Sequence, residues 1–136
     1  MIKIELNISV QPNQRPRTRI IKTKTGATFG WIYTPKETEE SKKMLKYKYK
    51  KYMLENNLNP IPDKVKIKVK IKIYTQKKFN FKIGDIDNYY KTITDAGNKI
   101  LWHDDYQISE IECIRISNAP KNKIILIIES LEQFLI

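Results

Sequence analysis

Lysine alternates with a branched aliphatic residue from Lys64 to Ile73 without a break. Successive side chains of a β-strand point to opposite faces, so this period of two predicts a strand over residues 64–74 with one apolar face and one charged face. The charged face either lies open to solvent or forms a row that faces phosphates. We favour the solvent, because sheets commonly expose one polar face to water. The apolar face holds Val65, Ile67, Val69, Ile71 and Ile73.

Other patterns place the remaining elements. Thr34, Pro35 and Glu37 supply a cap, a first-turn proline and the third position of a capping box, and so predict the start of a helix. Residues 11–30 are basic and interrupted by proline, which predicts a loop with a hairpin near Thr25-Gly26. We expect strands at residues 2–10, 28–33, 64–74, 107–116 and 123–129, and helices at residues 35–55 and 87–98. These elements predict one small α+β domain with a mixed or antiparallel sheet and two main helices.

The chain is strongly basic, with 26 lysines and arginines against 15 acidic residues and a formal net charge of +11. This excess favours a polyanionic partner, nucleic acid before an anionic membrane surface. No apolar run approaches the ~20 residues of a membrane span, and the start has no signal-peptide core, so we expect a cytoplasmic protein. One cysteine and one histidine exclude an internal disulfide, a cysteine-based zinc cluster and a multi-histidine site, which leaves oxygen ligands for any catalytic metal.

Five of the six aspartates lie between residues 85 and 105. Clustered carboxylates repel one another unless a cation or basic side chains lie between them. Asp85 and Asp87 stand where a loop enters the second predicted helix, close enough together to bind an oxygen-loving cation such as Mg²⁺. A third carboxylate, from Asp104 or Asp105, would complete a site of the kind that nucleases use on a scissile phosphate.

A structural interpretation of the same residues stands beside the catalytic one. Asp85 or Asp87 can cap the helix, and Asp87, Lys91 and Asp95 can form ion pairs along one helix face. The protein would then bind nucleic acid without catalysis. In the catalytic interpretation, Lys91 offsets the carboxylate charge or contacts the phosphate in the transition state. A third interpretation, a peripheral protein on anionic membranes, needs a basic helix with a bulky apolar face, which residues 35–55 match only in part.

Several other residues draw attention. We expect phosphate contacts from three arginines of the basic loop, and we leave three lysines that precede the acidic segment open between DNA contact and solvent. These residues are Arg15, Arg17 and Arg19, and Lys77, Lys78 and Lys82. Trp102 is expected in the core or in dimer packing, Tyr89 in the core, and Cys113 as a packed strand thiol. His103 is expected as an exposed turn residue.

The order of the acidic residues resembles a known signature. Residues 85–95 read Asp-x-Asp-Asn-x-x-Lys-x-x-x-Asp, and residues 102–108 read Trp-x-Asp-Asp-x-Gln-Ile. Together they resemble the RusA family of Holliday-junction resolvases, which are common in prophages. Gln14-Arg15-Pro16-Arg17 and Tyr33-Thr34-Pro35-Lys36-Glu37-Thr38 look like segments of the family's Gram-positive and phage branch. The resemblance covers about residues 8–116.

The resemblance implies a single RusA-like endonuclease domain over residues 1–136. It implies a homodimer that needs Mg²⁺, or Mn²⁺ as a substitute, binds four-way DNA junctions and nicks two opposed strands in recombination and repair. Asp85 and Asp87 would be paired metal ligands, Asp105 the third catalytic carboxylate and metal ligand, and Lys91 the lysine of the motif. A twofold dimer would match the symmetry of a four-armed substrate. Neither a membrane nor a small-molecule cofactor is implied.

Three details of the resemblance remain open. Asp95 and Asp104 match positions of the signature, but their roles are not assigned by it. Gly97-Asn98-Lys99 departs from the family, which more often has an apolar residue there and a slightly longer connection. We therefore expect the end of the second helix to differ from the family pattern.

Overall fold

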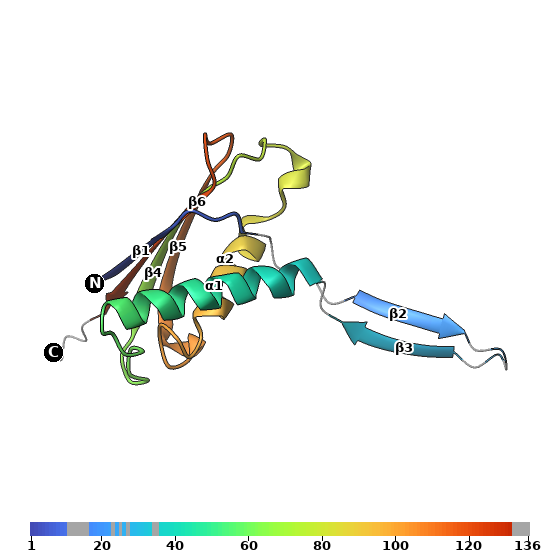
Figure 1. The fold of residues 1–136 in the computed structure, drawn as a ribbon, viewed down its shortest axis with the longest axis horizontal. Helices are drawn as coiled ribbons and strands as arrows, with labels where there is room; N and C mark the ends of the chain where they lie inside the picture. Colours follow the sequence, from blue (N-terminus) through green and yellow to red (C-terminus); the bar gives the residue numbers. More distant parts are fainter. Residues whose placement is uncertain (11–16, 23, 25, 27, 34–35, 132–136) are drawn as a thin grey trace.

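The computed structural model describes residues 1–10, 17–22, 24, 26, 28–33 and 36–131, and for residues 17–22 and 28–33 it describes the backbone. Its main sheet has the strand order β1-β6-β4-β5. β4 pairs in parallel with β5 and antiparallel with β6, and β1 pairs antiparallel with β6, so the sheet is mixed. The strands of this sheet are β1 (Ile2–Leu6), β4 (Ile67–Tyr74), β5 (Ile108–Ile116) and β6 (Lys123–Ser130). Two helices, α1 (Lys36–Glu55) and α2 (Ile86–Gly97), cover one face of it (Figure 1). The predicted α+β class is therefore confirmed.

The alternation in β4 has the structural meaning that the sequence predicts. Ile67, Val69, Ile71 and Ile73 are buried beneath the helices, and the lysines between them point to the opposite face. There Lys68 pairs with Glu110 at 3.6 Å and with Glu112 at 3.8 Å, both on β5. β4 begins at Ile67 rather than at residue 64, because the carbonyl of Val65 accepts a hydrogen bond from the side chain of Gln107 instead of joining the ladder.

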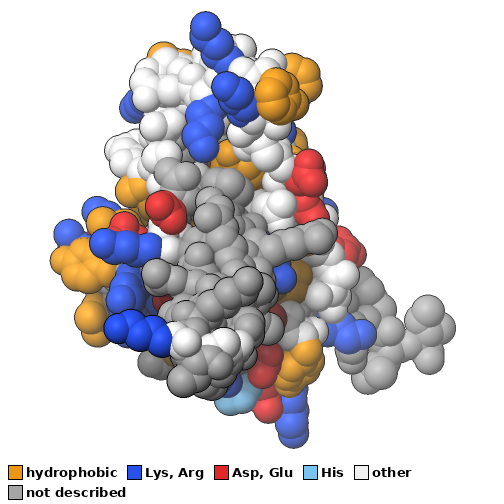
Figure 2. Space-filling view, turned by 90° about the vertical axis from the view of Figure 1, so that its right-hand side faces the viewer, with side chains coloured by type: hydrophobic (Ala, Val, Ile, Leu, Met, Phe, Trp, Pro, Cys, Tyr) orange, Lys and Arg blue, Asp and Glu red, His pale blue; other side chains and the backbone are white. Residues whose placement is uncertain are grey.

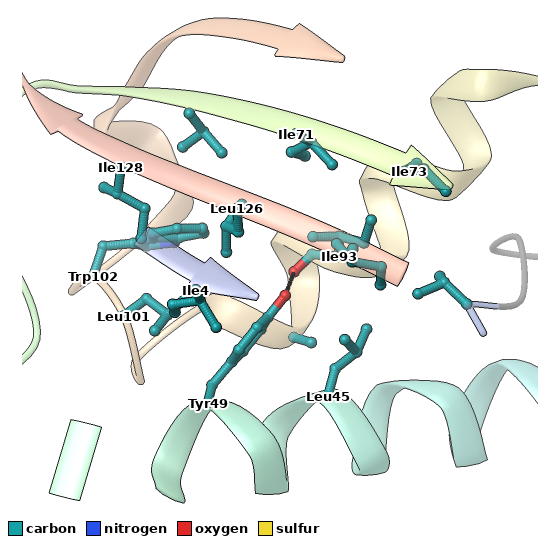
Figure 3. Close-up of a cluster of buried hydrophobic side chains, with 14 of the residues drawn as sticks. Ile4, Leu45, Tyr49, Ile71, Ile73, Ile93, Leu101, Trp102, Leu126 and Ile128 are labelled. Carbon is teal, nitrogen blue, oxygen red and sulfur yellow. Dashed lines mark hydrogen bonds between the residues drawn. The ribbon is translucent and has the colours of Figure 1, made fainter. Parts of the chain in front are cut away.

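The two helices meet over the centre of the sheet. α1 buries Leu45, Tyr49 and Met53, which recur every four residues and so share one face. The buried hydroxyl of Tyr49 donates to the backbone carbonyl of Ile93 on α2 at 3.1 Å (Figure 3). This bond satisfies the hydroxyl, which is the only polar group of the Tyr49 side chain. Burial raises the pKa of that hydroxyl. No helix of the described residues is long and apolar enough to cross a membrane.

The N-terminal region differs from the prediction in two ways. β1 ends at Leu6, although the apolar pattern continues to the buried Val10. Residues 17–22, predicted as loop, form the strand β2 (Arg17–Lys22). β2 pairs antiparallel with β3 (Thr28–Tyr33), so the hairpin predicted near Thr25-Gly26 is confirmed. Thr18, Ile20 and Ile21 favour this strand, and the basic charge of the segment concealed that preference. The hairpin lies beyond the start of α1 in Figure 1. Arg15 and the predicted helix start at Thr34-Pro35 lie outside the described residues.

The end of α2 depends on close packing rather than on glycine's conformational freedom. Gly97 is the last residue of the helix, and it is Lys99 that has a positive φ, of 66°. The buried indole of Trp102 packs directly on Gly97: a Cβ at this position would lie 2.9 Å from two atoms of that ring. A side chain at residue 97 would therefore require the indole to move.

We predict that Gly97→Ala lowers the free energy of unfolding by about 1–2 kcal/mol. The overpacking cost of ~1–3 kcal/mol outweighs the gain of up to ~1 kcal/mol in helix propensity. Urea denaturation of the purified variant measures the change. A variant as stable as the wild type would show that the indole moves aside at little cost.

Candidate active site

Asp85 and Asp87 lie where a loop from β4 turns into α2. A short 3₁₀-helix, η1 (Phe81–Ile83), precedes Gly84, whose φ of 85° turns the chain. Asp85 then occupies the N-cap position of α2, but its side chain makes no capping hydrogen bond. Asp87 is exposed in the first turn. Both carboxylates therefore lie at the helix end whose dipole favours negative charge, and neither forms an ion pair with a described residue.

The backbone before Asp85 is fixed by a contact that the sequence analysis missed. Arg115 of β5 donates from Nη1 to the carbonyl of Gly84 at 2.6 Å, and its guanidinium lies 5.3 Å from the centre of the Tyr89 ring. The Tyr89 hydroxyl in turn donates to the carbonyl of Ile83. Arg115 occupies a position of β5 whose side chain faces the helices, where the pattern is otherwise apolar. A charged residue at such a position was the feature of the sequence that could have identified this contact. The segment that delivers Asp85 is thus held by both β5 and α2.

Lys91 lies one helical turn after Asp87 on the exposed side of α2. Within the described part of the chain it forms no ion pair with Asp87 or Asp95. Asp95 instead pairs with Lys42 of α1 at 3.4 Å. The ion-pair ladder along α2 is therefore not formed, and Asp95 has a structural role that joins the two helices.

Asp105 is held by the core. The buried indole of Trp102 donates from Nε1 to Oδ1 of Asp105 at 2.7 Å. Partial burial raises the pKa of Asp105, and the negative charges of Asp95 and Asp104 add to this rise. The indole hydrogen bond and the Lys99 charge act in the opposite direction without cancelling it. Ionisation of Asp105 is therefore less favourable in the folded protein than in the unfolded chain.

Gln107 holds the segment that carries Asp104 and Asp105. Its Nε2 donates to the carbonyls of Pro62 at 2.6 Å and Val65 at 3.0 Å, and its Oε1 accepts from the backbone N–H of Asp104 at 2.8 Å. Gln107 is itself buried. Gln107, the last polar residue of the Trp-x-Asp-Asp-x-Gln-Ile pattern, therefore has a structural role: it joins the loop at residues 62–65 to the turn that carries Asp104 and Asp105.

The candidate carboxylates divide between the two ends of α2. Asp85 and Asp87 lie at its start, whereas Trp102 places Asp105 beside its last residue. The helix has 12 residues, which correspond to about 18 Å at ~1.5 Å per residue. Across the residues that the structure describes, no group of three acidic, histidine or cysteine side chains is close enough to hold a metal ion. Two carboxylates without protein partners fit an oxygen-liganded cation, but the third does not join them within the described chain.

Three lysines of the loop before Asp85 gather around one hollow in the surface. Lys77, Lys78 and Lys82 line a surface hollow together with Asn80 and Ile83. The Lys77 ammonium lies 3.5 Å from the hydroxyl of Tyr89. Arg17 and Arg19 lie on β2, of which the structure describes the backbone. Arg15 lies outside the described residues.

Three residues have the structural positions that the sequence predicts. Trp102 and Tyr89 are core residues, and His103 is exposed on a turn. Cys113 is half-buried on β5, and burial raises the pKa of its thiol to about 11. The thiol is therefore protonated at neutral pH, as expected for a packed residue rather than a nucleophile.

We predict that Asp105→Asn stabilises the metal-free protein at pH 7. A carboxyl whose pKa is raised by folding contributes stability below its unfolded pKa, about 3.9, and loses it as pH rises through the folded value. Asparagine retains an oxygen that accepts from Trp102 but carries no charge. The melting temperature in chelator should exceed that of the wild type at pH 7, and the difference should shrink toward pH 4. The exposed Asp63→Asn serves as the control for the loss of one surface carboxylate. Equal melting temperatures for Asp105→Asn and wild type at pH 7 would contradict the argument.

No curated protein matches the chain. The family model described as endodeoxyribonuclease RusA matches residues 8–129, which include both candidate carboxylate pairs, Lys91 and the loop before α2. This match extends over most of the 136 residues. The chain therefore belongs to the RusA endodeoxyribonuclease family.

Proposed function

We propose that this protein is a Mg²⁺-dependent endodeoxyribonuclease that resolves four-way DNA junctions by paired nicks during recombination and repair. Membership of the RusA family implies Holliday-junction nuclease activity. The observation that carries the proposal is the pair of carboxylates of Asp85 and Asp87 at a turn held by Arg115: Asp85 makes no capping bond, and neither carboxylate forms an ion pair with a residue that the structure describes. A non-catalytic DNA-binding protein accounts for Asp95, which pairs with Lys42, but gives the carboxylates of Asp85 and Asp87 no role.

Each residue of the proposed site has a distinct task. Asp85 and Asp87 would hold Mg²⁺, or Mn²⁺ in its place, with Asp105 as the third ligand. When bound, the metal supplies an activated water and stabilises charge on the scissile phosphate. Lys91 would place its positive charge near the same phosphate, because it lies one helical turn after Asp87. Lys77, Lys78 and Lys82, with Arg15, Arg17 and Arg19, would bind the DNA backbone.

We further propose that the active form is a homodimer in which the third carboxylate comes from the second subunit. Asp85 and Asp105 belong to opposite ends of α2, so one chain does not supply all three ligands at one place. A twofold axis would bring the N-terminus of α2 in one subunit near the C-terminus of α2 in the other. The symmetry would produce this arrangement at two places in the dimer. Two such sites match the two opposed strands of a four-way junction. We assign the chain to the family's Gram-positive and phage branch and expect it to act in the cytoplasm of a host that carries it as prophage.

We predict that Asp85→Asn, Asp87→Asn or Asp105→Asn abolishes cleavage of a labelled four-way junction in Mg²⁺ and leaves junction binding intact or stronger. Each change removes a metal ligand and also reduces repulsion of phosphate. Gel-shift and cleavage assays with the same junction measure the two effects. Asp63→Asn is the matched control, and wild-type turnover by all three variants would exclude the proposed site.

Mixed dimers test the shared site. When Asp85→Asn and Asp105→Asn subunits are combined, a shared arrangement places both changes in one site and leaves the other intact. We therefore expect the mixture to recover single nicks that neither variant makes alone. Recovery would not occur if each chain carried a complete site, and in that case the composite arrangement, though not the nuclease activity, would be wrong.

Lys91→Ala is expected to slow nicking by ~10²–10³-fold with little change in junction affinity or melting temperature. A surface ion-pair role would instead cost ~0.3–0.5 kcal/mol of stability and leave the rate nearly unchanged. Single-turnover cleavage at saturating enzyme and Mg²⁺ separates these cases, with Lys46→Ala on α1 as the control. A rate within about threefold of the wild type, roughly 0.65 kcal/mol of barrier, would remove Lys91 from the proposed site.

A further inference from the structure

Two phenylalanines on the loop before α2 are almost fully exposed to solvent. The exposed fraction is 78% for Phe79 and 92% for Phe81. A single exposed apolar residue needs no explanation, but two aromatic rings within three positions leave a compact apolar surface in water. Neither ring belongs to the hydrophobic core, and neither acts in the proposed chemistry. Their exposure therefore needs a partner outside this chain or a second function within the site.

The loop that carries these rings is well anchored at its base. The carbonyl of Lys77 accepts from the backbone N–H of Asn118 at 2.9 Å, and the backbone N–H of Gln76 donates to Oδ1 of Asn122 at 2.9 Å. Both partners belong to the turn between β5 and β6, which lies beside this loop in Figure 1. The start of the loop is therefore fixed to a neighbouring part of the same sheet.

The tip of the loop is also ordered by its own hydrogen bonds. Asn80 stands between the two phenylalanines, and its Oδ1 accepts from the backbone N–H of Lys82 at 2.9 Å, while its carbonyl accepts from Ile83 at 3.1 Å. Ile83 is buried and fixes the end of the turn. The rings are thus presented outward by a structured turn, which lowers the conformational entropy that a bound partner would have to remove.

The surroundings of the rings favour a nucleic acid as the partner. Lys77, Lys78 and Lys82 line the hollow beside them, and none of these lysines has an ion pair with a described acidic residue. The Lys82 ammonium lies 6.0 Å from the centre of the Phe81 ring. Figure 2 shows lysine and hydrophobic side chains together at the upper end of the molecule, where Figure 1 places this loop. Positive charge with flat apolar faces matches a polyanion that carries stacked bases.

The position of the loop restricts which bases these would be. Phe81 precedes Asp85 by four residues, and Arg115 fixes the backbone between them through Gly84. A phosphate bound at Asp85 and Asp87 therefore brings its neighbouring nucleotides close to the rings. Bases in a continuous duplex resist unstacking, whereas bases at a branch point have lost a stacking neighbour and cost less to engage.

We propose that Phe79 and Phe81 form a base-stacking element that engages bases at the branch point and selects branched over linear DNA. The proposal rests on the proposed function and adds the residues that recognise the substrate's shape. Stacking on an aromatic side chain changes affinity by about 5- to 150-fold per base. The lysines contribute affinity for any DNA, and the rings contribute the discrimination.

The test compares Phe79→Ala, Phe81→Ala and the double variant with Tyr47→Ala, which removes an aromatic ring of 62% exposure from α1. Binding to a fixed four-way junction and to linear duplex of equal length is measured in chelator, so that no cleavage occurs. 2-Aminopurine at the branch point reports base stacking directly. We expect the double variant to lose at least tenfold in junction affinity, to change duplex affinity less than twofold, and to abolish the 2-aminopurine response. Phe81→Trp should retain all three properties, and Tyr47→Ala should match the wild type.

Four results would overturn the proposal. Unchanged junction affinity and 2-aminopurine response in the double variant would show that the rings do not touch bases. An equal loss for junction and duplex would show general backbone binding. A changed oligomeric state, or lost binding to anionic vesicles, with unchanged junction binding would assign the rings to a second copy of the chain or to a membrane. Absence of junction preference in the wild type would defeat the proposed function itself, and this outcome is distinct because it precedes any substitution.

Discussion

The parallel pairing of β4 with β5 determines where the candidate site residues lie in the fold. Parallel neighbours need a crossover, and here the crossover carries α2 from the end of β4 back to the start of β5. Ile67 lies opposite Ile108 and Tyr74 opposite Ile116, so both strands end at the same edge of the sheet. Residues that follow β4 therefore meet residues at the end of β5, and Arg115 reaches Gly84 for this reason.

The same pairing separates the acidic residues. Asp85 lies beyond the last residue of β4, whereas Asp105 lies before the first residue of β5. Because the two strands are parallel, these residues lie at opposite edges of the sheet and at opposite ends of α2. In the sequence they fall within one window of 21 residues, and that proximity suggested a single cluster. The local pattern of carboxylates is readable from sequence, but their distance depends on which strands pair and in which direction. The proposal of a shared site in a dimer rests on this topology rather than on the spacing of the residues.

The elements that could be predicted are those whose pattern is strong and local. The alternation of β4, the four-residue recurrence in α1 and the glycine that ends α2 all correspond to observed elements. The reason for Gly97 was not predictable, because it depends on an indole five residues away that folds back onto the helix. Arg17 and Arg19 were assigned to a loop because charge and proline outweighed the β-preference of the residues between them. Arg115 was overlooked because a lone charged residue acquires meaning only when its register with Ile73 is known.

The distribution of charge also changes meaning once the fold is known. The lysine face of β4 is the most conspicuous basic feature of the sequence, yet Lys68 there is paired with two glutamates of the neighbouring strand. The loop lysines at residues 77, 78 and 82 have no such partners among the described residues. Because a paired charge projects a weaker field than an unpaired one, Lys68 contributes less to the attraction of a polyanion than each of these loop lysines does. The stretch from Lys77 to Asp87 carries these three lysines, the exposed rings of Phe79 and Phe81, and the carboxylates of Asp85 and Asp87. Arg115, near the end of β5, holds this stretch in position through the carbonyl of Gly84.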